Sequence, residues 1–198
     1  MSEPERCHWA THCELEAQYH DAEWGRPCQD DRTLFEFLIL EAAQAGLSWR
    51  TVLEKRDGYL RLYENFDVEK VAAFDQAKID AMLGDPSIVR NKLKVNSSVK
   101  NAKVFIDIQR EYGSFARYLW SFVDNKPIQG GLQDYRDTPV ESDVSIALSK
   151  ALKKRGMSFV GPTIMYAYMQ AVGLVNDHVA SCHCHDESRA LGERFELR

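Results

Sequence analysis

Cysteine and histidine gather near both ends of this 198-residue chain, a composition that favours a metal site. Cys7 and His20 lie early in the sequence, while His178 and Cys182 lie four residues apart near its end, so one helical turn can present the last two together. Two thiolates and two imidazoles make a closed tetrahedral zinc site, which is structural rather than catalytic. Such an ion would tie the two ends of the chain together.

Spacing alone leaves other ligand sets open, because further candidates lie nearby: His12, Cys13, His183, Cys184 and His185. The chain has five cysteines, an odd number, and no apolar stretch follows its first residues as in a secretory signal. We therefore expect a cytoplasmic location, where disulfides are rare. The plainer alternative to a metal site is a set of reduced thiols and surface histidines.

A carboxylate lies in the apolar stripe of a predicted helix, in the run LFEFLILEAAQA. At about 100° per residue, Glu41 falls on the same face as Leu34, Phe37 and Leu38. A carboxylate there is costly unless something uses it, so we expect a raised pKa or a partner that donates hydrogen bonds. The alternative is a buried ion pair with an arginine. The helix ends in a tight turn with the sequence QAGLSW. About one helical turn beyond Glu41, it places four candidate site residues: Gln44, Gly46, Leu47 and Trp49.

Aromatic side chains cluster in the same part of the sequence. Three of the four tryptophans (Trp9, Trp24 and Trp49) lie within the first fifty residues, together with Tyr19. Aromatic rings beside a carboxylate suit a planar, positively charged guest. Core packing is the commoner fate of any single aromatic residue and remains the alternative.

The segment SKALKKRGMSFVGPTIMYAYMQAVG has the pattern of a helix, a short turn and a second helix. Gly156 and Gly161 bound the turn, and both can adopt backbone conformations closed to other residues. The free N–H groups at the start of the second helix would bind an anion such as a phosphate. Lys153, Lys154 and Arg155 precede the turn and add positive charge. A plain helical hairpin with solubilising charges is the alternative.

Helical patterns dominate, and no stretch shows convincing strand alternation, so we expect an all-α fold. Asp30 or Asp31 can cap the Glu41 helix, Asp143 can cap the first hairpin helix, and Pro162 suits the first turn of the second. The polar segment 124–141 is predicted to be a loop between two lobes, and the charged tail from Asp186 is expected to be loose. The other expected helices span 48–56, 57–64, 68–73, 75–83, 88–112 and the run FARYLWSFV.

Composition is that of an ordinary globular protein, with 44% hydrophobic and 28% charged residues, and it holds no apolar run of the roughly 20 residues that a membrane span needs. The net charge of −5 argues weakly against a nucleic-acid partner. Its distribution argues the other way, because residues 144–176 carry four basic side chains and no acidic one, and residues 90–103 carry five more basic side chains without an acid. Solvated helix faces would explain both stretches equally well.

Five runs together resemble the 3-methyladenine DNA glycosylase I family: RCHW, YHDAEWG, LEAAQAGLSW, LSKALKKRGMSFVGPTI and GLVNDHVASC. They span about residues 6–185, in order and with similar gaps. The resemblance implies the helix-hairpin-helix DNA glycosylase fold, as one domain of two helical lobes over residues 1–198, with structural zinc joining the termini through segments 7–20 and 178–182. It selects Cys7, His20, His178 and Cys182 as the ligands.

The resemblance also implies an activity, the hydrolysis of the bond between 3-methyladenine and its sugar in alkylated double-stranded DNA after the base has been flipped out. Glu41 would be the catalytic residue, and the base pocket would be Trp9, Tyr19, Trp24 and Trp49. The turn at Gln44, Gly46 and Leu47 would fill the gap in the duplex, and the hairpin would hold phosphate through Gly156, Gly161 and the three basic residues before the turn. Asp177 is assigned a structural role, and a monomer is expected.

One position departs from the family pattern. Family members often carry a second pocket tyrosine three residues before the one matched by Tyr19, and this chain has Glu16 there. That change affects stacking on the base or adds a second carboxylate, so it bears on substrate range. Two other functions stay open: a non-catalytic binder of alkylated DNA, and a zinc hydrolase, which would need an open position on its metal.

Overall fold

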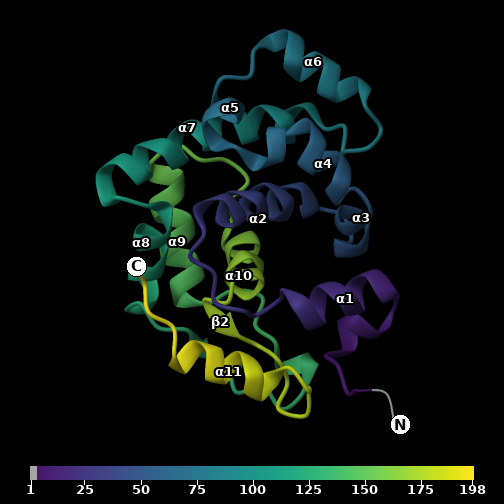
Figure 1. Ribbon diagram of the computed structural model, residues 1–198, viewed down its shortest axis with the longest axis vertical. Coiled ribbons are helices and arrows are strands. Elements are labelled where there is room, and N and C mark those ends of the chain that lie inside the picture. The colour runs from purple at the N-terminus through teal and green to yellow at the C-terminus, as the bar shows by residue number, and fades with distance from the viewer. Residues whose placement is uncertain (1–3) are drawn as a thin grey trace.

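The computed structural model describes residues 4–198 and is built almost entirely from helices (Figure 1). No helix within these residues is both long and apolar enough to cross a membrane. The α-helices are α1 (Glu14–Ala22), α2 (Asp31–Gln44), α3 (Trp49–Glu54), α4 (Arg56–Leu62), α5 (Val68–Ala72), α6 (Gln76–Gly84), α7 (Lys92–Tyr112), α8 (Phe115–Trp120), α9 (Asp143–Lys154), α10 (Pro162–Ala171) and α11 (His185–Glu193). Short 3-10 helices are η1 (His8–Thr11), η2 (Glu64–Phe66), η3 (Ser121–Val123) and η4 (Tyr135–Asp137).

A small parallel pairing departs from the all-helical prediction. Strand β1 (Ile128–Gln129) pairs with β2 (Val175–Asn176), with Ile128 opposite Val175. Two residues are too few for a period-two pattern, so nothing in the sequence predicts these strands. The pairing ties the 124–141 loop to the segment that follows α10, beside the metal-ligand candidates of the C-terminal part.

Helix boundaries follow the capping side chains. Asp30 accepts a hydrogen bond from the backbone N–H of Thr33 at 2.8 Å, as predicted for the start of α2. The prediction that Asp143 caps α9 is wrong, because Ser142 is the N-cap and forms a capping box with Ser145. Helix α7 begins four residues later than expected, because Asn91 caps it by accepting from two backbone N–H groups.

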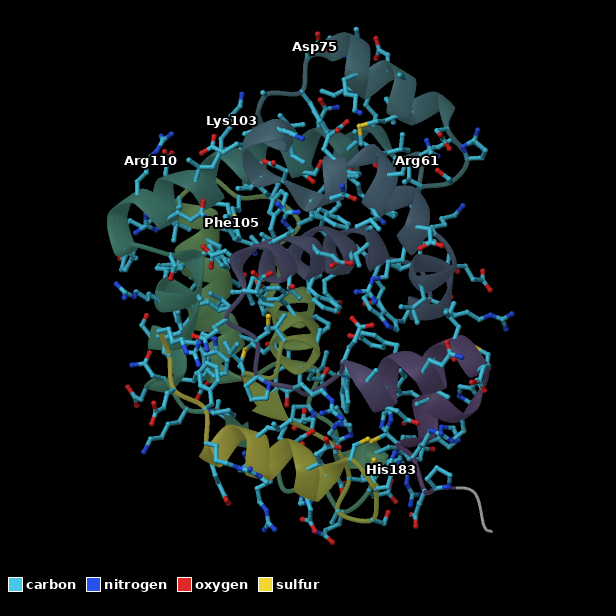
Figure 2. The ribbon with its side chains drawn as sticks, viewed as in Figure 1. Arg61, Asp75, Lys103, Phe105, Arg110 and His183 are labelled. Atoms are coloured by element: carbon cyan, nitrogen blue, oxygen red, sulfur yellow. The ribbon has the colours of Figure 1, made fainter. Side chains whose placement is uncertain are left out.

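Helix α2 crosses the middle of the molecule, with α4 to α7 on one side and α10, α1 and α11 on the other (Figure 1). Nine of its fourteen residues are buried, which explains its nearly continuous apolar sequence. The Tyr168 hydroxyl of α10 donates to the Leu34 carbonyl of α2 at 3.0 Å and fixes the two helices together. Helix α7 is amphipathic, with Phe105 turned inward and Lys103 and Arg110 turned outward (Figure 2).

The expectation of a loose tail after Asp186 is wrong. Residues 185–193 form α11, and Arg26 pairs with Glu187 at 2.9 Å. Beyond the helix, the Phe195 ring packs on Trp120 with centroids 4.2 Å apart. The residues that contact this C-terminal segment lie far away in the sequence. The charged pattern of the segment itself therefore could not predict that it packs against the rest of the protein.

Candidate active site

A cavity of about 370 Å³ lies where η1, α1, α2, α3 and α10 meet. Its volume is in the range of small-molecule sites, which are concave and mostly apolar. The cavity brings together residues from four separate stretches of the chain. All five residues predicted for the base pocket line it: Trp9, Tyr19, Trp24, Glu41 and Trp49.

Glu41 is 4% exposed, and its Oε2 has no hydrogen-bond partner among the described residues. Burial raises the pKa of its carboxyl to about 8. The alternative of a buried ion pair is wrong, because Arg56, on the neighbouring helix α4, binds Glu23 and Glu36 instead, each at 2.7 Å. Glu41 therefore has no counter-charge among the described residues. A ligand could provide the carboxyl group with a hydrogen-bond donor or a positive charge.

Two hydrogen-bond donors on the cavity wall have no partner within residues 4–198. They are the Tyr19 hydroxyl and the indole Nε1 of Trp49, and both are buried. Burial, followed by the charges of Glu41 and Glu23, raises the Tyr19 pKa well above its ordinary value, so its hydroxyl keeps the proton. Buried polar atoms are normally hydrogen-bonded. One acceptor and two donors that lack partners therefore point to a polar, planar guest in this cavity.

The aromatic walls touch one another at steep angles. Tyr19 and Trp49 have ring centroids 5.2 Å apart at 50°, and Trp9 and Trp24 have centroids 5.1 Å apart at 72°. Trp9 and Tyr19 are 6.1 Å apart at 53°. A ring stacked between two others needs about 7 Å, twice the contact distance of carbon atoms. A base therefore cannot lie between Trp9 and Tyr19 as they stand, and it would contact them as neighbouring walls.

Sequence reasoning missed several wall residues, among them Gln170 and Asp177. Asp177 is 3% exposed, and its Oδ2 accepts from the Tyr166 hydroxyl at 2.6 Å and from the Gln170 amide at 2.9 Å. Its Oδ1 has no partner in the described part of the chain and lies where a Cβ on Gly130 would collide with it. Glycine at 130 therefore lets the loop pass over this carboxylate. The loop supplies two more wall residues, Tyr135 and Thr138.

The turn after α2 lies at the edge of the cavity. Gln44 lines the cavity, Gly46 has a φ of +78° that favours glycine, and Leu47 is 41% exposed. Lys94 of α7 donates to the carbonyls of Ala43 and Ala45 at 2.7 and 2.6 Å. The last carbonyls of a helix have no partner inside the helix, so Lys94 fixes the turn from below. The apolar Leu47 side chain, in the same turn as the cavity-lining Gln44, remains exposed.

Helices α9 and α10 form the predicted hairpin. Gly156 has a φ of +105°, and Gly161 is the N-cap of α10 with no side-chain hydrogen bond across the cap. A Cβ on Gly161 would meet no described atom within 4 Å, so this end of α10 is open. Asn101 of α7 donates to the Ser158 carbonyl at 2.9 Å and accepts from its N–H at 2.9 Å. Two hydrogen bonds with Asn101 on α7 thus hold the backbone of the turn at Ser158.

The three basic residues at the hairpin differ in their surroundings. Lys153 and Lys154 are exposed. Arg155 binds Glu111 at 2.7 Å and lies 5.4 Å and 5.1 Å from the ring centroids of Tyr112 and Tyr118. Arg155 therefore fastens the hairpin to α7 and α8, and Glu111 offsets its charge. Of these three residues, the two lysines have no ion pair among the described residues and are exposed.

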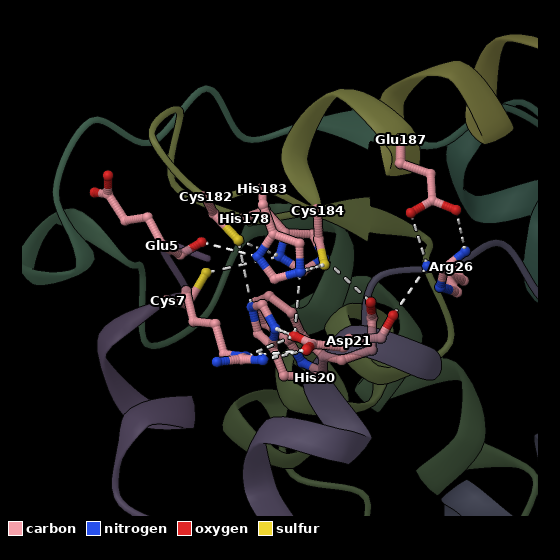
Figure 3. Close-up of polar contacts among 12 residues, drawn as sticks. Glu5, Cys7, His20, Asp21, Arg26, His178, Cys182, His183, Cys184 and Glu187 are labelled. Atoms are coloured by element: carbon pink, nitrogen blue, oxygen red, sulfur yellow. Dashed lines mark hydrogen bonds and ion pairs between the residues drawn. The ribbon is translucent and has the colours of Figure 1, made fainter. Parts of the chain in front are cut away.

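The predicted metal ligands come together in one cluster (Figure 3), and one of them, Cys7, also lines the cavity. Cys7, His20, His178 and Cys182 are all buried, and their ligand atoms lie within 4.8 Å of one another. The sulfur-to-nitrogen separations are 3.6 Å for Cys7–His178, 3.5 Å for Cys182–His178 and 3.5 Å for Cys182–His20. A tetrahedral zinc ion separates a thiolate sulfur from an imidazole nitrogen by roughly 3.6 Å. These four residues therefore have the identity and the spacing of a closed zinc site.

Outer contacts orient both imidazoles. His20 Nδ1 lies 2.8 Å from Asp21, whose carboxylate also binds Arg6 at 2.7 Å, and His178 Nε2 lies 3.2 Å from the Trp24 carbonyl. Such contacts fix the ring tautomers of metal-binding histidines. A hydrogen bond from Cys7, followed by those from His178 and His20, lowers the pKa of the Cys182 thiol. Cys182 is therefore the sulfur more ready to be a thiolate. His183 and Cys184 lie beside this set, and His12 and Cys13 are not part of it.

Comparison with known proteins gives a consistent result. The family model described as methyladenine glycosylase matches residues 9–185. The DNA-3-methyladenine glycosylase of Haemophilus influenzae is 44% identical over 179 residues, which cover 90% of this chain and 97% of that protein. DNA-3-methyladenine glycosylase 1 of Escherichia coli is 43% identical over 181 residues, which cover 91% of this chain and 97% of that protein.

Solved structures agree with this fold. A crystal structure of a 3-methyladenine DNA glycosylase I superposes with a TM-score of 0.89 at 43% identity and covers 91% of this chain and 100% of its own. A Staphylococcus aureus 3-methyladenine DNA glycosylase I, whose structure describes the recognition of 3-methyladenine, gives a TM-score of 0.88 at 35% identity. That match covers 91% of this chain and 96% of the other.

Proposed function

The chain belongs to the methyladenine glycosylase family, and from this premise we propose that it is a DNA-3-methyladenine glycosylase with the helix-hairpin-helix fold. It would flip the damaged base out of alkylated double-stranded DNA and hydrolyse the bond to the sugar. The observation that carries the proposal is the cavity itself, where Glu41, Tyr19 and Trp49 hold buried polar atoms without partners on an aromatic wall.

Methylation at N3 gives adenine a positive charge, and this charge is what the cavity recognises. Glu41 accepts a hydrogen bond from the exocyclic amino group and favours the cationic base. A cation beside the carboxyl lowers the pKa of Glu41 from about 8, so the group ionises as the base enters. Trp49 Nε1 and the Tyr19 hydroxyl donate to ring nitrogens. Neutral adenine offers no charge to offset an ionised, buried Glu41 and is bound more weakly.

Bond cleavage moves the positive charge. The electron pair of the bond between the sugar carbon and the base goes to the base, which leaves as a neutral molecule. The sugar carbon becomes cationic and is captured by water, which loses a proton to leave an abasic site. We expect a monofunctional enzyme that forms no Schiff base with the sugar, in keeping with a described cavity lining that holds no lysine.

Two surfaces hold the DNA. The open end of α10 and the backbone at Gly156 and Gly161 bind phosphate, with Lys153 and Lys154 adding charge and Arg155 fastening the hairpin. The turn of Gln44, Gly46 and Leu47 enters the duplex beside the flipped base, and the exposed Leu47 side chain occupies the gap.

Zinc held by Cys7, His20, His178 and Cys182 completes the fold as a structural ion. When bound, it supplies a link between the N-terminal and C-terminal parts and no reactive position, because four protein ligands leave no place for water. The separations of 3.5 to 3.6 Å between sulfur and nitrogen support this set. A zinc hydrolase would need an open fourth position, so the ligand set favours the glycosylase.

Release of free bases from methylated duplex DNA tests this function. The protein is incubated with the DNA, and the bases set free are separated by chromatography. We expect 3-methyladenine with little 7-methylguanine. Tight binding to the DNA without release of any base would instead indicate a non-catalytic damage binder.

A further inference from the structure

A third buried carboxyl group lines the same cavity, in addition to Glu41 and Asp177. Glu16 on α1 is 8% exposed, and its Oε2 accepts a hydrogen bond from the Cys13 thiol at 3.4 Å. A thiol is a weak donor, and a carboxylate has about four lone-pair positions to satisfy. Arg50 lies near enough to sense the charge of Glu16, but its ion pair is with Glu54 at 2.8 Å. Glu16 is therefore a carboxylate inside the site without a close counter-ion.

The register of α1 explains why Glu16 faces the guest. Glu16 and Tyr19 are three residues apart, so they share one face of the helix, and both line the cavity. His20, the next residue, belongs to the metal-ligand cluster. Helix α1 is thus fixed in rotation by His20 on one side and by Tyr19 against Trp49 on the other. The backbone that carries Glu16 therefore cannot rotate away from the cavity without breaking these contacts.

We propose that Glu16 is a specificity-determining residue that selects a positively charged base over a neutral one of the same shape. The inference rests on the proposed function. A cationic base entering the cavity gives Glu16 a partner and offsets the cost of its burial. A neutral base displaces solvent from the carboxylate without supplying a compensating positive charge, so its binding is weaker. Glu16 on α1 thus adds a carboxylate from a separate helix to the carboxyl groups that Glu41 on α2 and Asp177 already place on the cavity wall.

The same carboxylate affects release of the product. The base is cationic while bonded to the sugar and neutral once the bond is broken, because it keeps the electron pair. Glu16 therefore favours the substrate over the product. Its effect lies in discrimination and product release, since weakening of the bond to the sugar follows from the methyl group itself.

Small purines of defined charge test the proposal without any turnover. The probes are 3,9-dimethyladeninium, a permanent cation in which a methyl group replaces the sugar, and neutral 9-methyladenine. Their dissociation constants are measured by quenching of tryptophan fluorescence, since Trp9, Trp24 and Trp49 line the cavity. The wild type is compared with Glu16→Gln, and with Glu14→Gln, which removes an exposed charge from the same helix.

We expect Glu16→Gln to lower the preference for the cation by about ten- to a hundredfold, the range of one charge-assisted contact. Glu14→Gln should leave the preference within about twofold, because exposed charges are screened. Glu16→Asp, which keeps the charge, should retain most of the preference and serves if the glutamine variant does not fold. A Glu16→Gln preference equal to that of wild type, or a Glu16→Asp preference as low as that of Glu16→Gln, would overturn the proposal.

The proposed function fails independently of this inference. If wild type releases no base from methylated DNA, the glycosylase assignment is wrong whatever the purines show. If wild type releases 3-methyladenine and the purine preference does not depend on Glu16, only the selectivity role is wrong.

Discussion

Glu41 lowers the stability of the fold at neutral and alkaline pH. In an unfolded chain its carboxyl has a pKa near the ordinary value of 4.5, and in the folded protein the pKa is about 8. Between these values folding takes up a proton, so this residue's contribution to stability falls as pH rises and reaches its lowest level above pH 8. An isosteric neutral side chain removes that dependence.

Glu41→Gln should therefore be more stable than wild type at pH 8 and nearly equal to it at pH 5. A shift of this size corresponds to at most roughly 5 kcal/mol, and we expect a rise in Tm of about 5 °C or more at pH 8. Thermal unfolding at the two pH values measures it. An equal change in Tm at both values would mean that Glu41 carries no raised pKa.

Single residues could be placed largely from sequence. The apolar stripe on α2 located Glu41, and the density of early aromatics located the walls. The stripe could not reveal Asp177, whose place in the cavity depends on Gly130 in a loop 47 residues earlier. It also left an unspecified arginine open as a partner for Glu41, because the pairing of Arg56 with Glu23 and Glu36 is decided by the packing of α4.

At the scale of elements, α7 holds in position both segments that are proposed to contact DNA. Lys94 holds the Gln44–Leu47 turn, and Asn101 holds the hairpin turn. Burial lowers the pKa of Lys94. The sequence predicted both turns from their glycines but not α7 as their common support, because contacts between distant helices leave no local pattern.

Lys94→Met should loosen the Gln44–Leu47 turn. It removes a charged donor from two carbonyls, which costs about 1.5–3 kcal/mol. We expect excision of 3-methyladenine to slow about tenfold while small purines still bind, because the cavity walls are untouched. Lys103→Met, on the exposed side of the same helix, is the control. Equal excision rates for the Lys94 and Lys103 variants would exclude the supporting role.

Replacing Lys153 and Lys154 together with methionine should weaken binding to any duplex sequence. The slope of the logarithm of the binding constant against the logarithm of salt concentration should fall by about 2, one unit for each phosphate that a lysine no longer neutralises. Lys126→Met serves as a control for removal of a charge outside the hairpin. An unchanged slope in the double variant would move the DNA-binding surface away from the α9–α10 turn.

At the scale of the molecule, the Cys/His cluster and the cavity are in direct contact, and Cys7 belongs to both. Cys7 and Trp24 line the cavity, and the Trp24 ring lies 4.7 Å from His178 between centroids. Segments near both ends of the chain therefore pack together beside the pocket wall. The residue pattern left several ligand sets open, the family resemblance selected one, and the geometry supports that one. The packing of α11 and the residues after it was not predictable, because the residues that contact them, Arg26 and Trp120, lie far away in the sequence.

The purified protein should contain about one zinc ion per chain by elemental analysis, and Cys7→Ser should lose it. That variant should unfold at a lower temperature and excise slowly, because the wall formed by Trp9 and Trp24 loses its support. Cys28→Ser, which lies outside the cluster, should keep both the metal and the activity. A metal-free wild type with full stability would refute the structural role of zinc.

The most direct test of the account is single-turnover excision of 3-methyladenine from duplex DNA by wild type and Glu41→Gln. If an ionised Glu41 recognises the cationic base, the variant should bind the DNA as tightly through the hairpin but release the base at least about a hundredfold more slowly. Wild-type rates in Glu41→Gln, with its fold intact, would contradict the central role of this carboxylate.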